Sequence, residues 1–173
     1  MLELKPLAEE KREWFISSLQ WAFKQAMLDE LAENEAIISR EEIEATMKAD
    51  NAQSLQIEYQ GQPVAGAVVR IDEQTQRNCL DLFFVTANEH SKGFGLTAWQ
   101  AIEQHYPQTK IWETHTPYFE KRNIHFYVNK CGFKIVEFYH EKNPDPHSPN
   151  LQKNEQNSPL DEMFRFEKEM KTP

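Results

Sequence analysis

Cysteines, glycines and long apolar runs are all scarce in this chain of 173 residues. Its two cysteines, Cys79 and Cys131, are too few for the disulfide framework of a small secreted protein. No stretch approaches the roughly 18 apolar residues of a membrane span, and no charged and apolar leader opens the chain. These absences predict a cytoplasmic protein with reduced thiols and no membrane partner.

Excess positive charge is also lacking, since the formal net charge is −9. Nucleic-acid binding depends on clustered Lys and Arg, so we expect no nucleic-acid partner. The charge is uneven, however: residues 1–50 hold 12 acidic and 6 basic side chains, whereas residues 90–134 hold 3 and 6. A cationic segment in an acidic chain suits an anionic small ligand, although ordinary scatter accounts for it equally well.

Metal-ligand spacing is absent as well. The six histidines show neither H-x-x-x-H nor H-E-x-x-H, the spacings that place two zinc ligands on one helix face. We therefore expect no metal. In contrast, 11 Phe, 4 Trp and 5 Tyr are far more aromatics than a disordered chain carries, and the chain is long enough to bury a core.

Hydrophobic spacing predicts an α/β chain with a mixed sheet, in the order β-αα-βββ-α-β-α-ββ and in a single domain, 1–173. Ser39 and Glu42 fit a capping box, which predicts that a short helix begins there. The other expected helices cover 8–32, 93–105 and 119–131. The expected strands cover 2–5, a hairpin over 54–71, 78–86, 109–114, 133–140 and 161–169. Residues 141–160 hold four of the nine prolines, so we expect a long loop there, either a functional flap or a mobile surface loop.

Two of the five glycines, Gly93 and Gly95, lie between a predicted strand and a predicted helix, in the segment His90-Ser91-Lys92-Gly93-Phe94-Gly95. Glycines let successive backbone N–H groups point at one spot, and the following helix adds partial positive charge. Such a loop binds phosphate or pyrophosphate, and Lys92 adds a full charge.

One interpretation of this loop is a dinucleotide fingerprint, because residues 93–98 satisfy G-x-G-x-x-A and Glu113 follows where a ribose-binding acid would lie. That fingerprint requires the strand to run almost directly into the first glycine, whereas residues 87–92 intervene here. Too few residues follow Glu113 for the rest of a dinucleotide fold, so we disfavour this interpretation.

The second interpretation involves more of the chain. Residues 83–95 (FFVTANEHSKGFG) resemble the acyl-CoA-binding motif of the GNAT N-acetyltransferase superfamily, and residues 126–133 (FYVNKCGF) resemble its second landmark. The order of elements is also similar, and the stretches around Trp112 and Arg122 look like a bacterial small-molecule branch of the family. The resemblance implies acetyl-CoA as co-substrate, a small-molecule amine as acceptor and direct attack in a ternary complex. It also allows a homodimer.

The resemblance implies sites for both parts of acetyl-CoA. The strand before the loop would bind the pantetheine arm through its backbone, the loop would hold the pyrophosphate, and a helix residue would add a pantetheine contact. The implied cofactor-binding residues are Phe84, Val85, His90, Ser91, Lys92, Gly93, Phe94, Gly95, Leu96 and Asn123.

Tyr127 matches the family's general acid, which protonates the leaving thiolate, although a core aromatic residue would fit the same pattern. We name Glu113 as the general base that deprotonates the amine, while His115, Glu58 and Asp81 remain alternatives. His90 and Glu120 depart from the family pattern. They leave open a second possibility, a regulatory protein that binds acyl-CoA without turnover.

Overall fold

The computed structural model describes residues 2–26, 38–86, 93–146 and 162–171. In these ranges the chain forms one seven-stranded sheet of order β1-β2-β3-β4-β5-β7-β6. The strands are β1 Leu2–Pro6, β2 Ala52–Tyr59, β3 Gln62–Arg70, β4 Arg77–Val85, β5 Ile111–Pro117, β6 Lys134–Tyr139 and β7 Met163–Glu169. The helices are η1 Glu9–Lys11, α1 Arg12–Ala26, α2 Arg40–Met47, α3 Phe94–His105, α4 Lys121–His125 and the π-helical η3 Phe126–Lys130.

The order of these elements is the predicted one, and the mixed α/β class is confirmed. β4 and β5 form the one parallel pair of the described sheet. Parallel neighbours need a crossover connection, and here α3 lies within it. No helix in the described ranges is long and apolar enough to cross a membrane.

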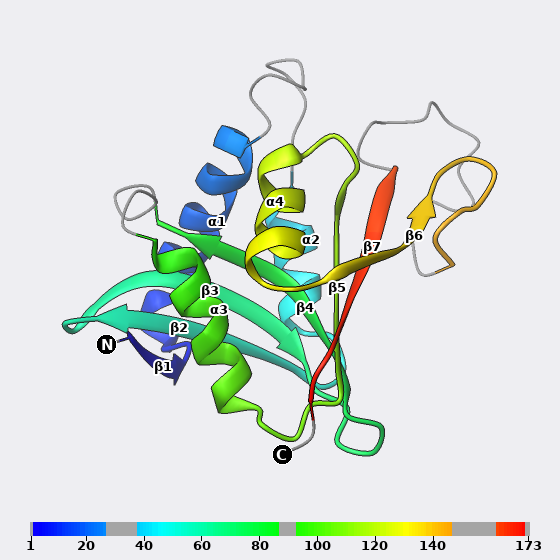
Figure 1. Ribbon diagram of the computed structural model, residues 1–173. Coiled ribbons are helices and arrows are strands. Elements are labelled where there is room, and N and C mark those ends of the chain that lie inside the picture. The colour runs from blue at the N-terminus through cyan, green and yellow to red at the C-terminus, as the bar shows by residue number, and fades with distance from the viewer. Residues whose placement is uncertain (1, 27–37, 87–92, 147–161, 172–173) are drawn as a thin grey trace.

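Helices cover both faces of the sheet (Figure 1). α3 and α4 pack on one face, over a core that includes Trp99, Trp112 and Phe166. α1 and α2 pack on the other face, over a core built around Phe15 and Ile43. We call these the α3 face and the α1 face. Alternation along each strand decides which residues reach which face.

Local sequence signals explain several boundaries. The Ser39 side chain accepts a hydrogen bond from the Glu42 backbone N–H at 3.1 Å, which caps α2 as predicted. The first turn of the predicted helix over 8–32 is instead the 3₁₀ helix η1, and residues 27–37 lie outside the described ranges. Of the predicted loop, residues 147–160 also lie outside them.

The predicted helix over 119–131 has two parts. After α4, the Cys131 N–H bonds to the Phe126 carbonyl at 2.9 Å, an i→i+5 contact that widens the turn into η3. Gly132 then ends the segment at φ +89°, a left-handed conformation that favours glycine. Single π-helical turns of this kind frequently lie at functional sites, and η3 contains Tyr127.

Candidate active site

The two parallel strands separate partway along their length. β4 and β5 pair from Arg77–Ile111 to Leu80–Thr114 and no further, while β4 continues to Val85 and β5 to Pro117. Figure 1 shows β4 diverging from β5 beyond this point. We call the opening beyond the Leu80–Thr114 pair the fork. A strand pair that parts in this way leaves backbone positions between the strands for an extended ligand.

Phe84 and Val85, the predicted pantetheine-binding residues, lie on β4 beyond the fork and pair with Gly66 and Ala65 of β3. Both side chains are buried. The Phe84 ring packs against Phe15 on the α1 face, with ring centroids 5.1 Å apart. The side chains therefore anchor this part of β4.

The N-terminus of α3 adjoins the fork. Gly93 caps the helix at φ +72° and is exposed, with open space where a Cβ would lie. A Cβ on Gly95 would lie 3.2 Å from Cε1 of Phe126, so this glycine lets α3 approach η3 closely. The N–H groups of the first helical turn, which begins with Phe94 and includes Leu96, have no partner within the helix. His90, Ser91 and Lys92 lie outside the described residues.

Tyr127 lies on the α3 face and is 7% exposed, between the rings of Phe126, Phe133 and Phe166. Burial raises the pKa of its hydroxyl well above the usual value, and a hydrogen bond with Thr114 lowers it by less. Thr114 Oγ1 in turn donates to the Leu80 carbonyl at 2.9 Å. A polar chain thus joins Tyr127 to the last residue pair before the fork, and the hydroxyl holds its proton at neutral pH.

Asn123, on α4, donates a hydrogen bond from Nδ2 to Thr116 Oγ1 at 3.3 Å. Thr116 lies on β5 beyond the fork and is buried. Asn123 is therefore close to the fork on the side of α4.

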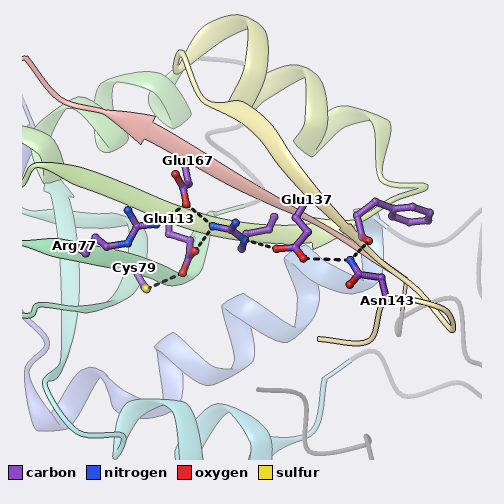
Figure 2. Close-up of polar contacts among 8 residues, drawn as sticks. Arg77, Cys79, Glu113, Glu137, Asn143 and Glu167 are labelled. Atoms are coloured by element: carbon purple, nitrogen blue, oxygen red, sulfur yellow. Dashed lines mark hydrogen bonds and ion pairs between the residues drawn. The ribbon is translucent and has the colours of Figure 1, made fainter. Parts of the chain in front are cut away.

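Glu113, the predicted base, points to the α1 face, where it is part of an extended polar network (Figure 2). Arg165 of β7 donates to Glu113 Oε1 at 2.7 Å and to Glu137 Oε1 at 3.2 Å. Arg165 also pairs with Glu167, which pairs with Arg77. The Cys79 thiol donates to Glu113 Oε2 at 3.5 Å. Both carboxylate oxygens of Glu113 are therefore engaged.

This network sets the protonation of Glu113. Partial burial raises its pKa, but the hydrogen bonds from Arg165 and Cys79, the charge of Arg165 and, when it is protonated, the charge of His115 outweigh burial and hold the pKa below its usual value. A carboxylate with a lowered pKa is a weak proton acceptor.

Two of the alternative bases are also engaged. Glu58, on β2, pairs with Lys5 at 2.9 Å, and that hydrogen bond lowers its pKa. Asp81, on β4, accepts two hydrogen bonds from Arg70. The third alternative, His115, is the first β5 residue beyond the fork and stacks on Tyr139, with ring centroids 6.0 Å apart.

Sequence reasoning missed Arg165 and Thr114. Arg165 lies between Phe164 and Phe166 in an alternating strand, a pattern that indicates a charged side chain on the face opposite two aromatics. That pattern predicts the face of the sheet on which the Arg165 side chain lies, but it does not predict the residues that Arg165 contacts. Thr114 carries no such signal, because its role depends on the place where β4 and β5 separate.

The sequence profile of the acetyltransferase (GNAT) family matches residues 9–133. The chain belongs to the GNAT family. This membership makes it an acetyltransferase and confirms the family and enzyme class expected from the two motifs. The protein YrkN of Bacillus subtilis (strain 168) is 49% identical over 162 residues, which cover 91% of this chain and 87% of YrkN.

Solved structures show the same fold at low sequence identity. A spermidine N-acetyltransferase from Vibrio cholerae, in complex with CoA and spermine, has a TM-score of 0.68 and 14% identity, and covers 97% of this chain and 95% of its own. The PaiA N-acetyltransferase from Thermoplasma acidophilum, in complex with coenzyme A, has a TM-score of 0.67 and 14% identity, with coverage of 98% and 99%. At this identity the likeness shows the fold, and the GNAT fold is confirmed.

Proposed function

We propose that this acetyltransferase transfers the acetyl group of acetyl-CoA to the amine of a small molecule, by direct attack in a ternary complex with Tyr127 as general acid. The main support is the polar chain from Tyr127 through Thr114 to Leu80, which ends where β4 and β5 separate. Acetyl-CoA supplies the acetyl group as an activated thioester.

The residues around the fork fit this co-substrate. The open left-handed turn at Gly93 and the first-turn amides of Phe94, Gly95 and Leu96 suit a pyrophosphate. We assign His90, Ser91 and Lys92 to the same phosphate cradle by sequence. The backbone of Phe84 and Val85 would bind the pantetheine arm, and Asn123 would contact it from α4.

Tyr127 would give its proton to the thiolate that leaves when the amide forms. Its raised pKa keeps the hydroxyl protonated at neutral pH, so that a proton is present to be given when the thiolate forms. Glu113 transfers no proton in this scheme, because its carboxylate already accepts a hydrogen bond from Arg165. Its role is to hold Arg165 in place. The proposal also includes a single domain and a location in the cytoplasm, a compartment that suits the free thiols Cys79 and Cys131. A homodimer is one assembly to test.

The first test is binding. Acetyl-CoA, CoA and NADH would each be added to the full chain at about 100 times a plausible Kd, where a ligand of the folded state adds about 2.7 kcal/mol. We expect both CoA ligands to raise Tm by about 5–10 °C and NADH to leave it unchanged. A chain that no CoA ligand stabilises would contradict the proposal.

The second test is turnover. Thiol release from acetyl-CoA would be followed with spermine, spermidine and a panel of neutral and anionic amines. Tyr127→Phe should lower kcat, whereas Tyr106→Phe is a matched control at the far end of α3, where the hydroxyl donates to Gln53. Binding of acetyl-CoA without thiol release for any amine would favour the regulatory alternative.

A further inference from the structure

We propose that His115 is the general base of this enzyme, and that it takes the proton of the acceptor ammonium on the face of the sheet opposite Tyr127. This inference rests on the proposed acetyl transfer, which requires an amine without its extra proton. It depends on three observations: the position of His115 relative to the fork, the contact that holds its ring, and the hydrogen bonds that the other candidate bases already make to cationic side chains.

The position of His115 follows from strand alternation. Thr114 belongs to the last β4–β5 pair and points to the α3 face, where it meets Tyr127. His115 is the next residue and therefore points to the α1 face. Acid and base would thus lie on opposite sides of the same opening, one beside the leaving sulfur and the other beside the incoming nitrogen.

The ring of His115 is held in place. It stacks on Tyr139 of β6 at an interplanar angle of 19°, and Tyr139 is itself 5% exposed. A base whose ring is fixed by packing loses little entropy when it meets its substrate. Tyr139 is a positioning residue in this scheme.

The surroundings keep His115 neutral. Burial lowers its pKa and is the largest effect; Arg165 of β7 lowers it further. Glu113 on β5, Asp145 after β6 and Asp81 on β4 act in the opposite direction and do not reverse the shift. A neutral imidazole at pH 7 is able to accept a proton, whereas Glu113 and Glu58 are already hydrogen-bonded to cationic side chains.

The protons balance. The ammonium gives one proton to His115, which passes it to solvent, and the neutral amine forms the C–N bond as the C–S bond breaks. Tyr127 gives its proton to the sulfur and regains one from the nitrogen, which loses two protons in all. The products are an amide, a free thiol and one proton released to solvent.

The test uses His115→Gln in the full chain, with His105→Gln as a matched control at the exposed end of α3. Acetyl-CoA should raise the Tm of both variants as it raises that of the unaltered chain, which shows that the fold and the cofactor site are intact. With spermidine or the best amine of the panel near pH 7, His115→Gln should lose about 100-fold or more in kcat. His105→Gln should lose none.

The pH profile separates a base from a merely structural residue. The unaltered enzyme should lose kcat/KM with an acid limb below 6.5, the usual pKa of histidine. For His115→Gln that limb should disappear, and the deficit should shrink towards about pH 9.5, where more of the amine is already neutral. A variant within about threefold of the unaltered enzyme, with the same acid limb, would overturn the inference alone. An unaltered chain that acetylates no amine would overturn the proposed function with it.

Discussion

Gly66→Ala should destabilise the protein, because the two aromatic rings beside Gly66 occupy the space that a methyl group needs. Gly66 pairs with Phe84 across β3 and β4. A Cβ on Gly66 would lie 2.5 Å from Phe84 Cε1 and 2.8 Å from Phe15 Cε2. Carbon atoms prefer about 3.5–4.0 Å, so both rings would have to move by about 1 Å.

The rings have little room to move. Phe15 is 0% and Phe84 3% exposed, they form an edge-to-face pair, and Trp14 packs on Phe84 with centroids 5.6 Å apart. Overpacking of this kind costs about 1–3 kcal/mol, and replacing a strand glycine by alanine returns about 0.5–1 kcal/mol. The net loss should be about 1–2 kcal/mol, which lowers Tm by about 2–8 °C in a chain of this size.

The assay is urea and thermal unfolding of Gly66→Ala, Phe84→Leu and the double variant. Leucine lacks the two ring carbons of Phe84 nearest to the new methyl group, so Gly66→Ala should cost about 1 kcal/mol less in the Phe84→Leu background. A Gly66→Ala protein that melts within 1 °C of the unaltered chain, or above it, would refute the packing described for this part of β4.

Three further predictions concern polar groups. Arg165→Met should lower the free energy of unfolding by about 1–2 kcal/mol near pH 7, a value between those for exposed and buried ion pairs. This loss should fade as the pH falls below 4.5, the usual pKa of Glu113. The reason is that a carboxylate whose pKa is lowered in the folded state stabilises the protein only when the pH is above that value. An equal loss in urea unfolding at pH 7 and at about pH 3 would contradict the ion pair. Ser39→Ala should lose about 1 kcal/mol in thermal unfolding and Ser39→Asp far less; equal losses would argue against a capping role. Burial raises the pKa of Cys79 and of Cys131 to about 12. Iodoacetamide at about pH 8 should therefore label neither thiol until urea unfolds the protein. Rapid labelling without urea would contradict this prediction, because it would show that the thiols are accessible in the folded protein.

Where a structural signal was local, the sequence predicted it well. The Ser39 cap and the alternation that built the β2–β3 hairpin each depend on a few neighbouring residues. The π-helical turn was not predicted, because one widened turn leaves hydrophobic spacing over 119–131 almost unchanged. It shows in the Cys131–Phe126 backbone bond, which no spacing rule encodes.

The candidate site was predicted less completely, because its polar contacts join distant segments. Glu113 is a plausible base by position, but its protonation depends on Arg165, which lies 52 residues further along the chain. The sequence shows that both residues lie in strands. It does not show that β7 inserts between β5 and β6, and this insertion is what brings Arg165 beside Glu113.

The insertion of β7 also links the Glu113 carboxylate, which Arg165 holds, to the proposed base His115. β7 pairs Arg165 directly with His115, while the Arg165 side chain reaches Glu113, two residues earlier on β5. A free Glu113 carboxylate would raise the pKa of His115 and favour imidazolium, which is unable to accept a proton. The positive charge of Arg165 opposes this effect of Glu113; Glu113 has the larger effect of the two on the pKa of His115, and burial outweighs both. Arg165 therefore makes Glu113 a weak base and acts against protonation of His115, and the two observations support a single assignment of the base.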